Sequence, residues 1–217
     1  AGSSFQFGDE SFVDTREAGI FASQELQYDN TYFLTLGLRR DYSTQVGEQA
    51  PSIFYPKVSG AVRVGQFDFV PDYFDLLKLR AAYGETGQLP GRLAGLARLW
   101  EAAPSGYGTG AALDAIGNPE IEPETVREFT TGLDADLFGR SSLSVTYYRN
   151  QADGSIISFQ EAPSTGLVAS ARPFNVGQKS GQGVEVDLSV TPIERDFLSV
   201  TADFIYSYNT NTVESLG

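Results

Sequence analysis

The chain has no cysteine, no histidine and no methionine, and only one tryptophan among its 217 residues. Without cysteine it forms no disulfide framework and no thiolate site. Without histidine and cysteine it also lacks the Ser-His-Asp, Cys-His and zinc constellations of common enzymes. Methionine is missing even at position 1, and the sequence stops in polar residues. We therefore expect a piece of a longer polypeptide.

Basic residues are also scarce. Fifteen lysines and arginines stand against 28 aspartates and glutamates, for a net charge of −13. Nucleic-acid binding needs a basic footprint, so this balance argues against a nucleic-acid partner. No apolar run reaches the ~18 residues of a transmembrane helix. That absence leaves a transmembrane barrel open, because barrel strands are only about 10 residues long and alternate in polarity.

What the chain does contain is strict alternation. Leu77, Leu79 and Tyr83 fall on one side of an extended segment, and Lys78 and Arg80 fall on the other. A period of two predicts a β-strand. Similar segments recur along the sequence, and they predict eight strands at residues 16–28, 32–41, 53–64, 77–84, 123–138, 142–150, 183–191 and 197–209.

The predicted connections alternate between short and long. Turns at 29–31, 139–140 and 192–196 are short, and the segments 42–52, 85–122 and 151–180 are long. An up-and-down meander with one trimmed rim has this pattern, as do outer-membrane barrels with short periplasmic turns and long extracellular loops. The connection 65–75 fits least well. Within the longest loop, the apolar pattern of 93–103 predicts one short helix.

The apolar rows are nearly free of charge over their middle, as lipid-facing rows must be, because a mid-bilayer charge costs about 2–4 kcal/mol. Arg40 and Arg149 share this side but sit near strand ends, where they can reach water. Tyrosines at the strand ends resemble two interfacial belts: Tyr28 and Tyr32 at the short-turn rim, and Tyr55, Tyr83, Tyr147, Tyr206 and Tyr208 at the long-loop rim. A soluble β-sandwich also alternates, and periodicity leaves both readings open.

The polar rows carry the charges that we expect to face the lumen of such a barrel. They are Arg39, Lys57, Arg63, Lys78, Arg80, Glu128, Asp134, Asp136, Glu185 and Asp187. Paired carboxylates such as Asp134 and Asp136 could serve acid–base chemistry. We favour plain lumen polarity, with salt bridges from these aspartates to Arg80 or Lys78 on the neighbouring strand.

Three loop features have competing interpretations. Glu120, Glu122 and Glu124 could bind calcium, although a solvated loop end is the commoner role of such a cluster. The glycine-rich segment 106–110 follows no strand-to-helix pattern, so we discount a phosphate cradle. Trp100 and Tyr107 are the best candidates for ligand contact, because aromatic side chains in long outer loops can stack on ligands such as sugars. Packing within the loop explains them equally well.

Five segments, in order, resemble the barrel portion of TonB-dependent outer-membrane receptors, most closely the SusC/RagA-like branch. They are YFLTLGLRRD at 32–41 with Ser43 and Gly47, FYPKVS at 54–59, LKLRAAYGETG at 77–87, NPEIEPE at 118–124, and NVG at 175–177 with GVE at 183–185. The resemblance covers roughly residues 16–209. It departs at Gln88, where asparagine is common, and at Pro123, where an aromatic or basic residue is common.

The resemblance implies a location in the Gram-negative outer membrane and a role in active import of a large solute, such as an oligosaccharide, a peptide or a chelated metal. It implies no enzyme activity and no cofactor. A 22-stranded barrel of this type has a plugged lumen. The implied partners are TonB, acting through a plug absent here, a SusD-like surface lipoprotein and membrane lipid. The plug and the last barrel strands would lie outside residues 1–217, so we expect an open, curved sheet of about eight strands with two free edges.

Two alternatives stay open. One is a passive porin-like or structural outer-membrane β-protein, which an upstream plug sequence would argue against. The other is a secreted carbohydrate-binding β-sandwich, which solubility without detergent would favour.

Overall fold

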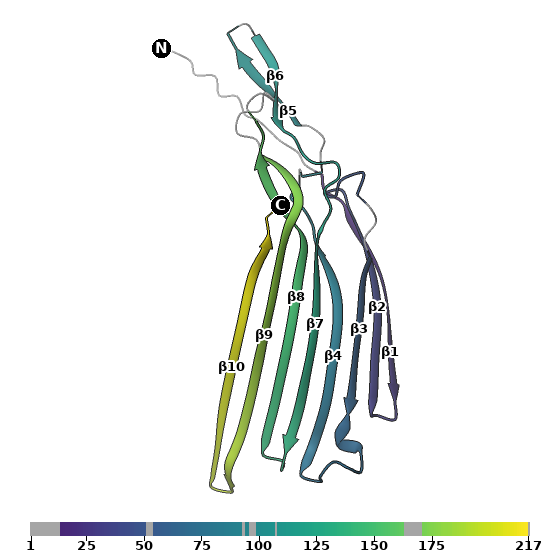
Figure 1. Cartoon of the computed structure of the whole chain (residues 1–217), viewed down its shortest axis with the longest axis vertical. Helices are drawn as coiled ribbons and strands as arrows, with labels where there is room; N and C mark the ends of the chain where they lie inside the picture. Colours follow the sequence, from purple (N-terminus) through teal and green to yellow (C-terminus); the bar gives the residue numbers. More distant parts are fainter. Residues whose placement is uncertain are drawn as a thin grey trace.

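The computed structural model describes residues 14–50, 54–92, 94–95, 99–106, 108–162 and 171–216. Its strands form an eight-stranded antiparallel sheet in the order β1-β2-β3-β4-β7-β8-β9-β10, and β5 and β6 form a separate two-stranded hairpin. Each strand of the large sheet pairs with the next one along the chain once this hairpin is set aside (Figure 1). The topology is therefore an up-and-down meander, as predicted.

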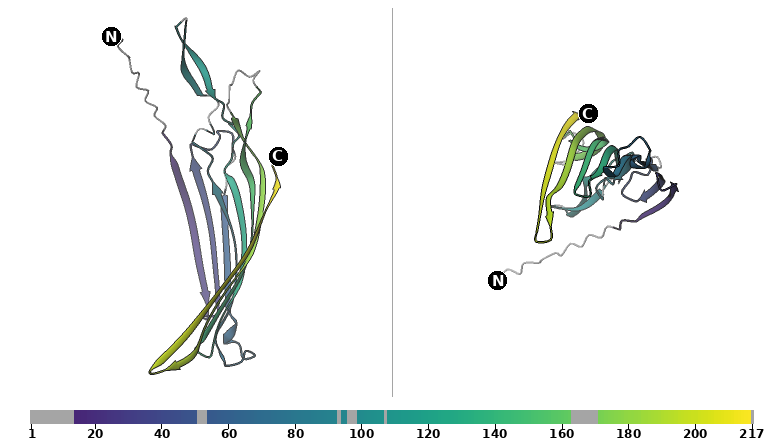
Figure 2. Two further views of the ribbon diagram at one scale, coloured as in Figure 1. Left: turned by 90° about the vertical axis from the view of Figure 1, so that its left-hand side faces the viewer. Right: turned by 90° about the horizontal axis from the view of Figure 1, so that it is seen from below.

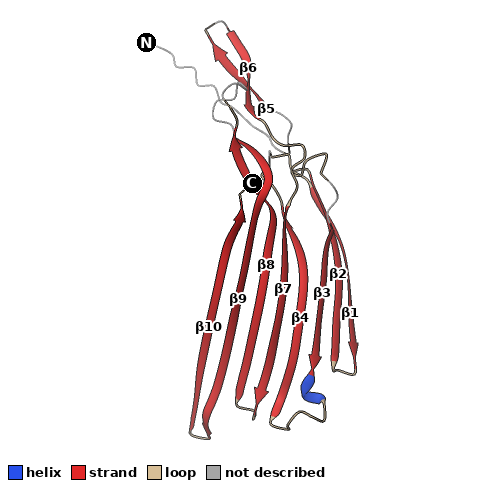
Figure 3. Cartoon of the chain, viewed as in Figure 1, coloured by secondary structure: helices blue, strands red, loops and turns tan. Residues whose placement is uncertain are grey.

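The large sheet consists of β1 (Glu17–Tyr28), β2 (Tyr32–Ser43), β3 (Phe54–Arg63), β4 (Phe74–Gln88), β7 (Glu124–Leu137), β8 (Ser141–Gln160), β9 (Ala171–Arg195) and β10 (Leu198–Ser215). The hairpin consists of β5 (Leu99–Ser105) and β6 (Gly108–Ala115). A single 3-10 turn, η1 (Val64–Gln66), follows β3 and is the blue segment in Figure 3.

The large sheet is open and curved. Figure 2 shows it as an arc that does not close, with β1 at one edge and β10 at the other. Within the described residues no second sheet packs on either face of this arc, since the β5–β6 hairpin projects beyond its end (Figure 1). The prediction of an all-β open sheet is confirmed. The sandwich alternative is wrong, because two sheets packed face to face are its defining feature.

The sheet has almost no core of its own. Among the described residues, Tyr55, Ile121 and Ala135 are the buried apolar ones, whereas large apolar side chains stand in the open. On β2 the exposed row holds Tyr32, Leu34, Leu36 and Leu38, and the intervening Phe33, Thr35 and Gly37 are half-buried. A sheet that exposes a continuous apolar face of this size needs an apolar environment to cover it.

The short connections all lie at one end of the sheet, at the bottom of Figure 1. The β1–β2 turn uses Asp29 and Asn30 at positive φ, and the β7–β8 turn uses Gly139 at φ +62°. Aromatic rings gather at this rim. The ring centroids of Tyr28 and Tyr32 lie 6.3 Å apart, and those of Tyr73 and Phe138 lie 5.4 Å apart. Phe67 extends the first pair, at 6.4 Å from Tyr32.

Tyr55 does not belong to a belt on the apolar face, where the tyrosine pattern had placed it. Its Cα partner on β2 is Arg39, a residue of the polar row, and its side chain is buried. The reason is parity. Tyr55 is an even number of residues from Lys57, so both project from the polar face of β3.

The helix predicted at 93–103 is wrong. Residues from Leu99 onward form β5, and its Cα register with β6 runs from Leu99 opposite Ala115 to Ser105 opposite Gly108. Pairing along a hairpin satisfies the backbone of both segments and outweighs the local helix preference of the alanines. Gly108, at φ +122°, supports the turn. Residues 93 and 96–98 lie outside the described residues.

The long loop predicted at 151–180 is also wrong over most of its length. β8 continues to Gln160 and β9 begins at Ala171, so the two strands have 20 and 25 residues. Hydrophobic alternation is lost in these parts of the two strands, but the ladder of backbone hydrogen bonds continues. A bulge at Asp153–Ser155, with Gly154 at φ +68°, marks this change.

β4 likewise extends to Gln88, and β10 extends to Ser215. Among the described residues, no helix has the length and apolar character needed to cross a bilayer.

Candidate functional site

The polar face of the sheet holds all ten charges singled out in the sequence. Cross-strand register joins the rows: Arg63 faces Lys78, and Lys78 faces Asp134. The charges segregate by strand. The five cations Arg39, Lys57, Arg63, Lys78 and Arg80 lie on β2, β3 and β4, and the five anions Glu128, Asp134, Asp136, Glu185 and Asp187 lie on β7 and β9. Among these ten charges, the cations thus lie on one side of the face and the anions on the other.

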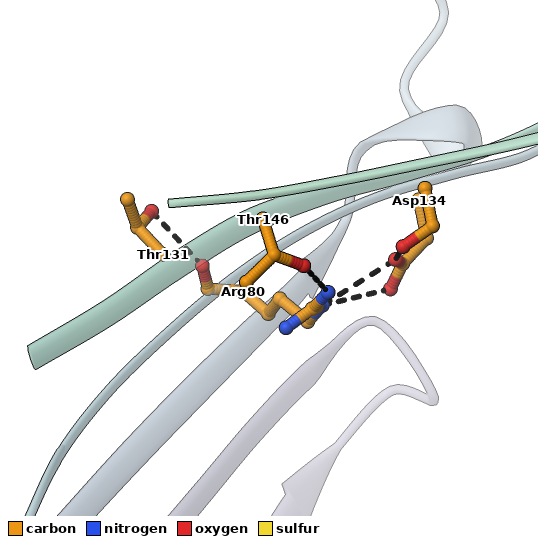
Figure 4. A network of polar contacts seen from close by, with 5 residues as sticks. Arg80, Thr131, Asp134 and Thr146 are labelled. Atoms are coloured by element: carbon orange, nitrogen blue, oxygen red, sulfur yellow. Dashed lines mark hydrogen bonds and ion pairs between the residues drawn. The ribbon is translucent and has the colours of Figure 1, made fainter. Parts of the chain in front are cut away.

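Arg80 joins the two sides (Figure 4). Its Nε lies 3.2 Å from Oδ2 of Asp134, and its Nη2 donates to Oγ1 of Thr146 on β8 at 2.6 Å. Oγ of Ser144 donates to Oδ1 of the same aspartate at 2.9 Å. The predicted salt bridge is confirmed with Arg80, whereas Lys78, the other candidate, forms no ion pair with Asp134.

The network is partly exposed, with 32% of the Arg80 side chain and 26% of the Asp134 side chain accessible. An ion pair in this setting contributes about 1 kcal/mol or less, and the added hydrogen bonds raise its geometric precision more than its energy. Both oxygens of Asp134 are occupied by donors. Its carboxylate therefore anchors the guanidinium of Arg80.

A second polar cluster lies near the long-loop end of β2 and β3. Arg39 pairs with Asp41 at 3.0 Å, and its guanidinium lies over the ring of Tyr55 at 5.2 Å from the centroid. Tyr55 in turn packs against Gly87, where any side chain would collide with the tyrosine hydroxyl. These contacts fix the upper part of the polar face.

Three segments near the long-loop end of the sheet are tied together by hydrogen bonds. The N–H of Gly47 donates to the carbonyl of Ile121 at 2.8 Å, and the N–H of Gln49 donates to the carbonyl of Pro119 at 3.1 Å. Ile121 is fully buried there. We call this contact of segment 43–50, segment 116–124 and the paired ends of β8 and β9 (154–160 and 171–175) the loop junction.

Two asparagines complete the loop junction. Oδ1 of Asn175 accepts from the N–H of Glu122 at 2.8 Å, and its Nδ2 donates to the carbonyls of Glu122 and Gly154, each at 2.9 Å. Nδ2 of Asn118 donates to the carbonyl of Pro173 at 3.1 Å. Both asparagines belong to segments that resemble family motifs. The sequence alone did not predict that their side chains would join the loop segments. The only available signal was their position in those motifs.

The acidic cluster belongs to the same junction. Glu120 is exposed, and the carboxylate of Glu124 accepts the N–H of Ile156 at 2.8 Å. The structure thus gives Glu124 a backbone partner in β8. In the part of the chain that the structure describes, no group of three or more acidic, histidine or cysteine side chains is arranged to hold a metal.

The two aromatic candidates for ligand contact are not brought to a described site. Trp100 lies on β5, where its Cα partner is Leu113. Tyr107 lies outside the described residues. Their role in ligand contact stays a prediction.

Residues 2–216 match the family described as TonB dependent receptor-like, beta-barrel. The chain belongs to this family. A curated relative, the TonB-dependent receptor P39 of Formosa agariphila, is 27% identical over 203 residues, which are 92% of this chain and 19% of that protein. The chain therefore spans about a fifth of the length of this relative.

Solved structures share the fold. The RagAB peptide importer in its open-open state matches with a TM-score of 0.83 at 22% identity, over 93% of this chain and 22% of the other. The siderophore receptor PirA of Pseudomonas aeruginosa matches with a TM-score of 0.60 at 15% identity, over 92% of this chain and 35% of the other. The predicted likeness to the SusC/RagA-like branch is confirmed.

The family is one of outer-membrane transporters and receptors rather than enzymes. This membership accounts for the exposed apolar face of the sheet, which the outer membrane covers. The polar face lies on the opposite side of the same strands.

Proposed function

We propose that this chain forms part of the wall of a TonB-dependent active transporter that imports a large solute, such as an oligosaccharide, a peptide or a chelated metal. The observation that carries the proposal is the match of residues 2–216 to the receptor barrel family. The open meander with an apolar face and a charged face supports it, because such a sheet forms a wall between lipid and water.

In this proposal residues 1–217 are part of one barrel domain, and the plug and the remaining strands lie outside them. Barrels of 22 strands have a plugged lumen. TonB would act on that plug, and a SusD-like lipoprotein at the cell surface would cover the mouth. The tall β8–β9 and β5–β6 hairpins stand on the side of the long loops, where solute and lipoprotein would first meet the receptor.

The test uses the whole receptor in its own outer membrane. Cells that carry or lack the gene are compared for uptake of labelled oligosaccharides, peptides and chelated iron, each with and without TonB. We expect one of the solutes to enter only when both the receptor and TonB are present. Uptake that needs the receptor but not TonB would establish the passive porin-like alternative. No difference for any solute would reject transport.

A further inference from the structure

The polar face contains a hollow of about 390 Å³ between β2, β3, β4 and β7. Its floor is made of small side chains, among them Ser59, Ala61 and Ala82. The cations Arg63 and Lys78 stand at its wall, together with the Arg80 that reaches toward β7. The hollow thus combines room for an incoming side chain with a concentration of positive charge.

Two of these cations, Arg63 and Lys78, form no ion pair with a carboxylate among the described residues. Arg63 and Lys78 face each other directly across the β3–β4 ladder, an arrangement that destabilises a sheet when the charges are alike. The carboxylate opposite Lys78 on β7 is that of Asp134, which is already engaged by Arg80 and Ser144. The pair therefore leaves positive potential in the hollow that an anion would neutralise.

Arg63 is also held in place. The guanidinium of Arg63 lies over the ring of Phe33, 5.2 Å from its centroid. The hydroxyl group of Thr35 lines the same hollow and can donate to an oxygen ligand, whereas that of Thr130 donates to the carboxylate of Glu128 at 3.3 Å. A carboxylate between two cations and near a hydroxyl donor forms charge-assisted hydrogen bonds, which are stronger than neutral ones.

The occupant is identified by location and by chain length. Arg63 is the last residue of β3, next to the short-turn rim, so the hollow lies away from the long loops. Eight strands account for 22% of the matched RagAB chain, so twenty-two such strands would account for about 60% of it. A large part of such a receptor therefore lies outside its barrel wall, available to fill the lumen.

We propose that this hollow receives an acidic segment of the plug, whose carboxylates bind Arg63 and Lys78. The inference rests on the proposed function, because it requires a plug. It adds the place of contact on the wall and the sign of the charge on the plug. An acidic solute passing through the lumen is the competing occupant.

The experiment uses the full-length receptor in outer-membrane vesicles, with the photo-cross-linker p-benzoylphenylalanine at Ala82 in the floor of the hollow. We expect cross-links to a plug peptide that contains neighbouring aspartates or glutamates. The double variant Arg63→Glu/Lys78→Glu should lower the yield at least about tenfold, since it replaces attraction with repulsion. Reversal of the plug acids to lysine in that background should restore the yield.

The matched control is Lys57→Glu, which reverses a cation of the same strand and face that does not line the hollow. Its yield should stay near that of the parent. Heat-modifiable migration in detergent gels checks that every variant has folded as a barrel. A cross-linked plug peptide without acidic residues, an unchanged yield in the double variant, or loss of the cross-link on addition of solute would each overturn the proposal.

The two proposals fail separately. TonB-independent uptake with an intact cross-link would reject the proposed transport mechanism and leave the plug contact standing. TonB-dependent uptake with no plug peptide attached at Ala82 would reject the plug contact and leave transport standing.

Discussion

Gly132 leaves the space in which Arg80 crosses β7. A Cβ atom at Gly132 would lie 2.7 Å from Cζ of Arg80 and 2.9 Å from its Nη2, closer than real Cβ contacts allow. The glycine thus permits the guanidinium to reach both Asp134 on β7 and Thr146 on β8. The bridge between the basic and acidic sides of the polar face depends on a missing side chain.

We expect Gly132→Ala to displace Arg80 and to remove its bond to Thr146. The loss should destabilise the barrel by about 1–2 kcal/mol, typical of a broken polar network. The measurement is the temperature at which the full-length receptor loses its heat-modifiable migration. Gly84→Ala is the control, because that glycine lies on the same face with open space around its Cβ position and should change little. Equal effects of the two substitutions would contradict this account.

The Arg80–Asp134 pair can be tested with a double-mutant cycle. Arg80→Ala and Asp134→Ala should each destabilise the receptor, and the double variant should lose less than their sum, with a coupling of about 1 kcal/mol. Chemical denaturation of the receptor in lipid vesicles supplies the four free energies of unfolding. Strict additivity would show that the two side chains do not support each other.

Asn175 is expected to hold the loop junction together. Asn175→Ala removes one accepted and two donated hydrogen bonds, leaving backbone groups of Glu122 and Gly154 without a partner. The local cost should be about 2–3 kcal/mol. Hydrogen exchange should therefore speed up in residues 118–124, and Asn209→Ala, in an exposed position of β10, should leave that segment unchanged. Unaltered protection of 118–124 in Asn175→Ala would count against the junction.

A substitution at Gly47 tests the contact of segment 43–50 with the rest of the loop junction. A Cβ at this position would lie 2.1 Å from the carbonyl oxygen of Pro119, which is backbone and cannot rotate away. Gly47→Ala should separate segments 43–50 and 116–124 and expose both to added protease on intact cells. Gly91→Ala has nothing near its Cβ and serves as the control. Resistance of the Gly47→Ala receptor to cleavage would refute the predicted separation.

The assignment of the apolar face to lipid predicts an asymmetric response to charge. Leu79→Arg places a cation on the exposed apolar row and should cost about 2–4 kcal/mol if that row lies near the bilayer centre. Gly84→Arg places the same charge on the polar face of the same strand, where water is available. The ratio of folded to unfolded receptor after insertion into vesicles measures both. A larger loss for Gly84→Arg would reverse the assignment of faces.

Much of this arrangement could be predicted from the sequence, because alternation reports which face a residue takes. The row from Leu77 to Tyr83 predicted β4, and the adjacency of β4 and β7 predicted the bridge from Arg80 to Asp134. The pattern failed for β5 and for the outer parts of β8 and β9. In those segments apolar and polar residues do not alternate, so the sequence pattern carries no sign of a strand.

The loop junction could not be predicted from the sequence for a different reason. Its contacts join residues such as Gly47 and Ile121, which are distant in sequence and belong to no shared ladder. Hydrophobic periodicity relates residues within one strand and does not predict contacts between loop residues that are distant in sequence. Their spatial closeness follows only once the whole sheet has brought the loop ends together.

The loop junction also limits how receptors of this kind can exchange parts. Segment 43–50, segment 116–124 and the paired ends of β8 and β9 (154–160 and 171–175) are encoded far apart, yet each supplies backbone or amide groups that the others need. A recombination event that replaces one segment with the version from a divergent relative would join surfaces that never evolved together. The three segments should therefore be inherited as one block, and chimeric receptors should retain their outer architecture only when all three come from the same parent.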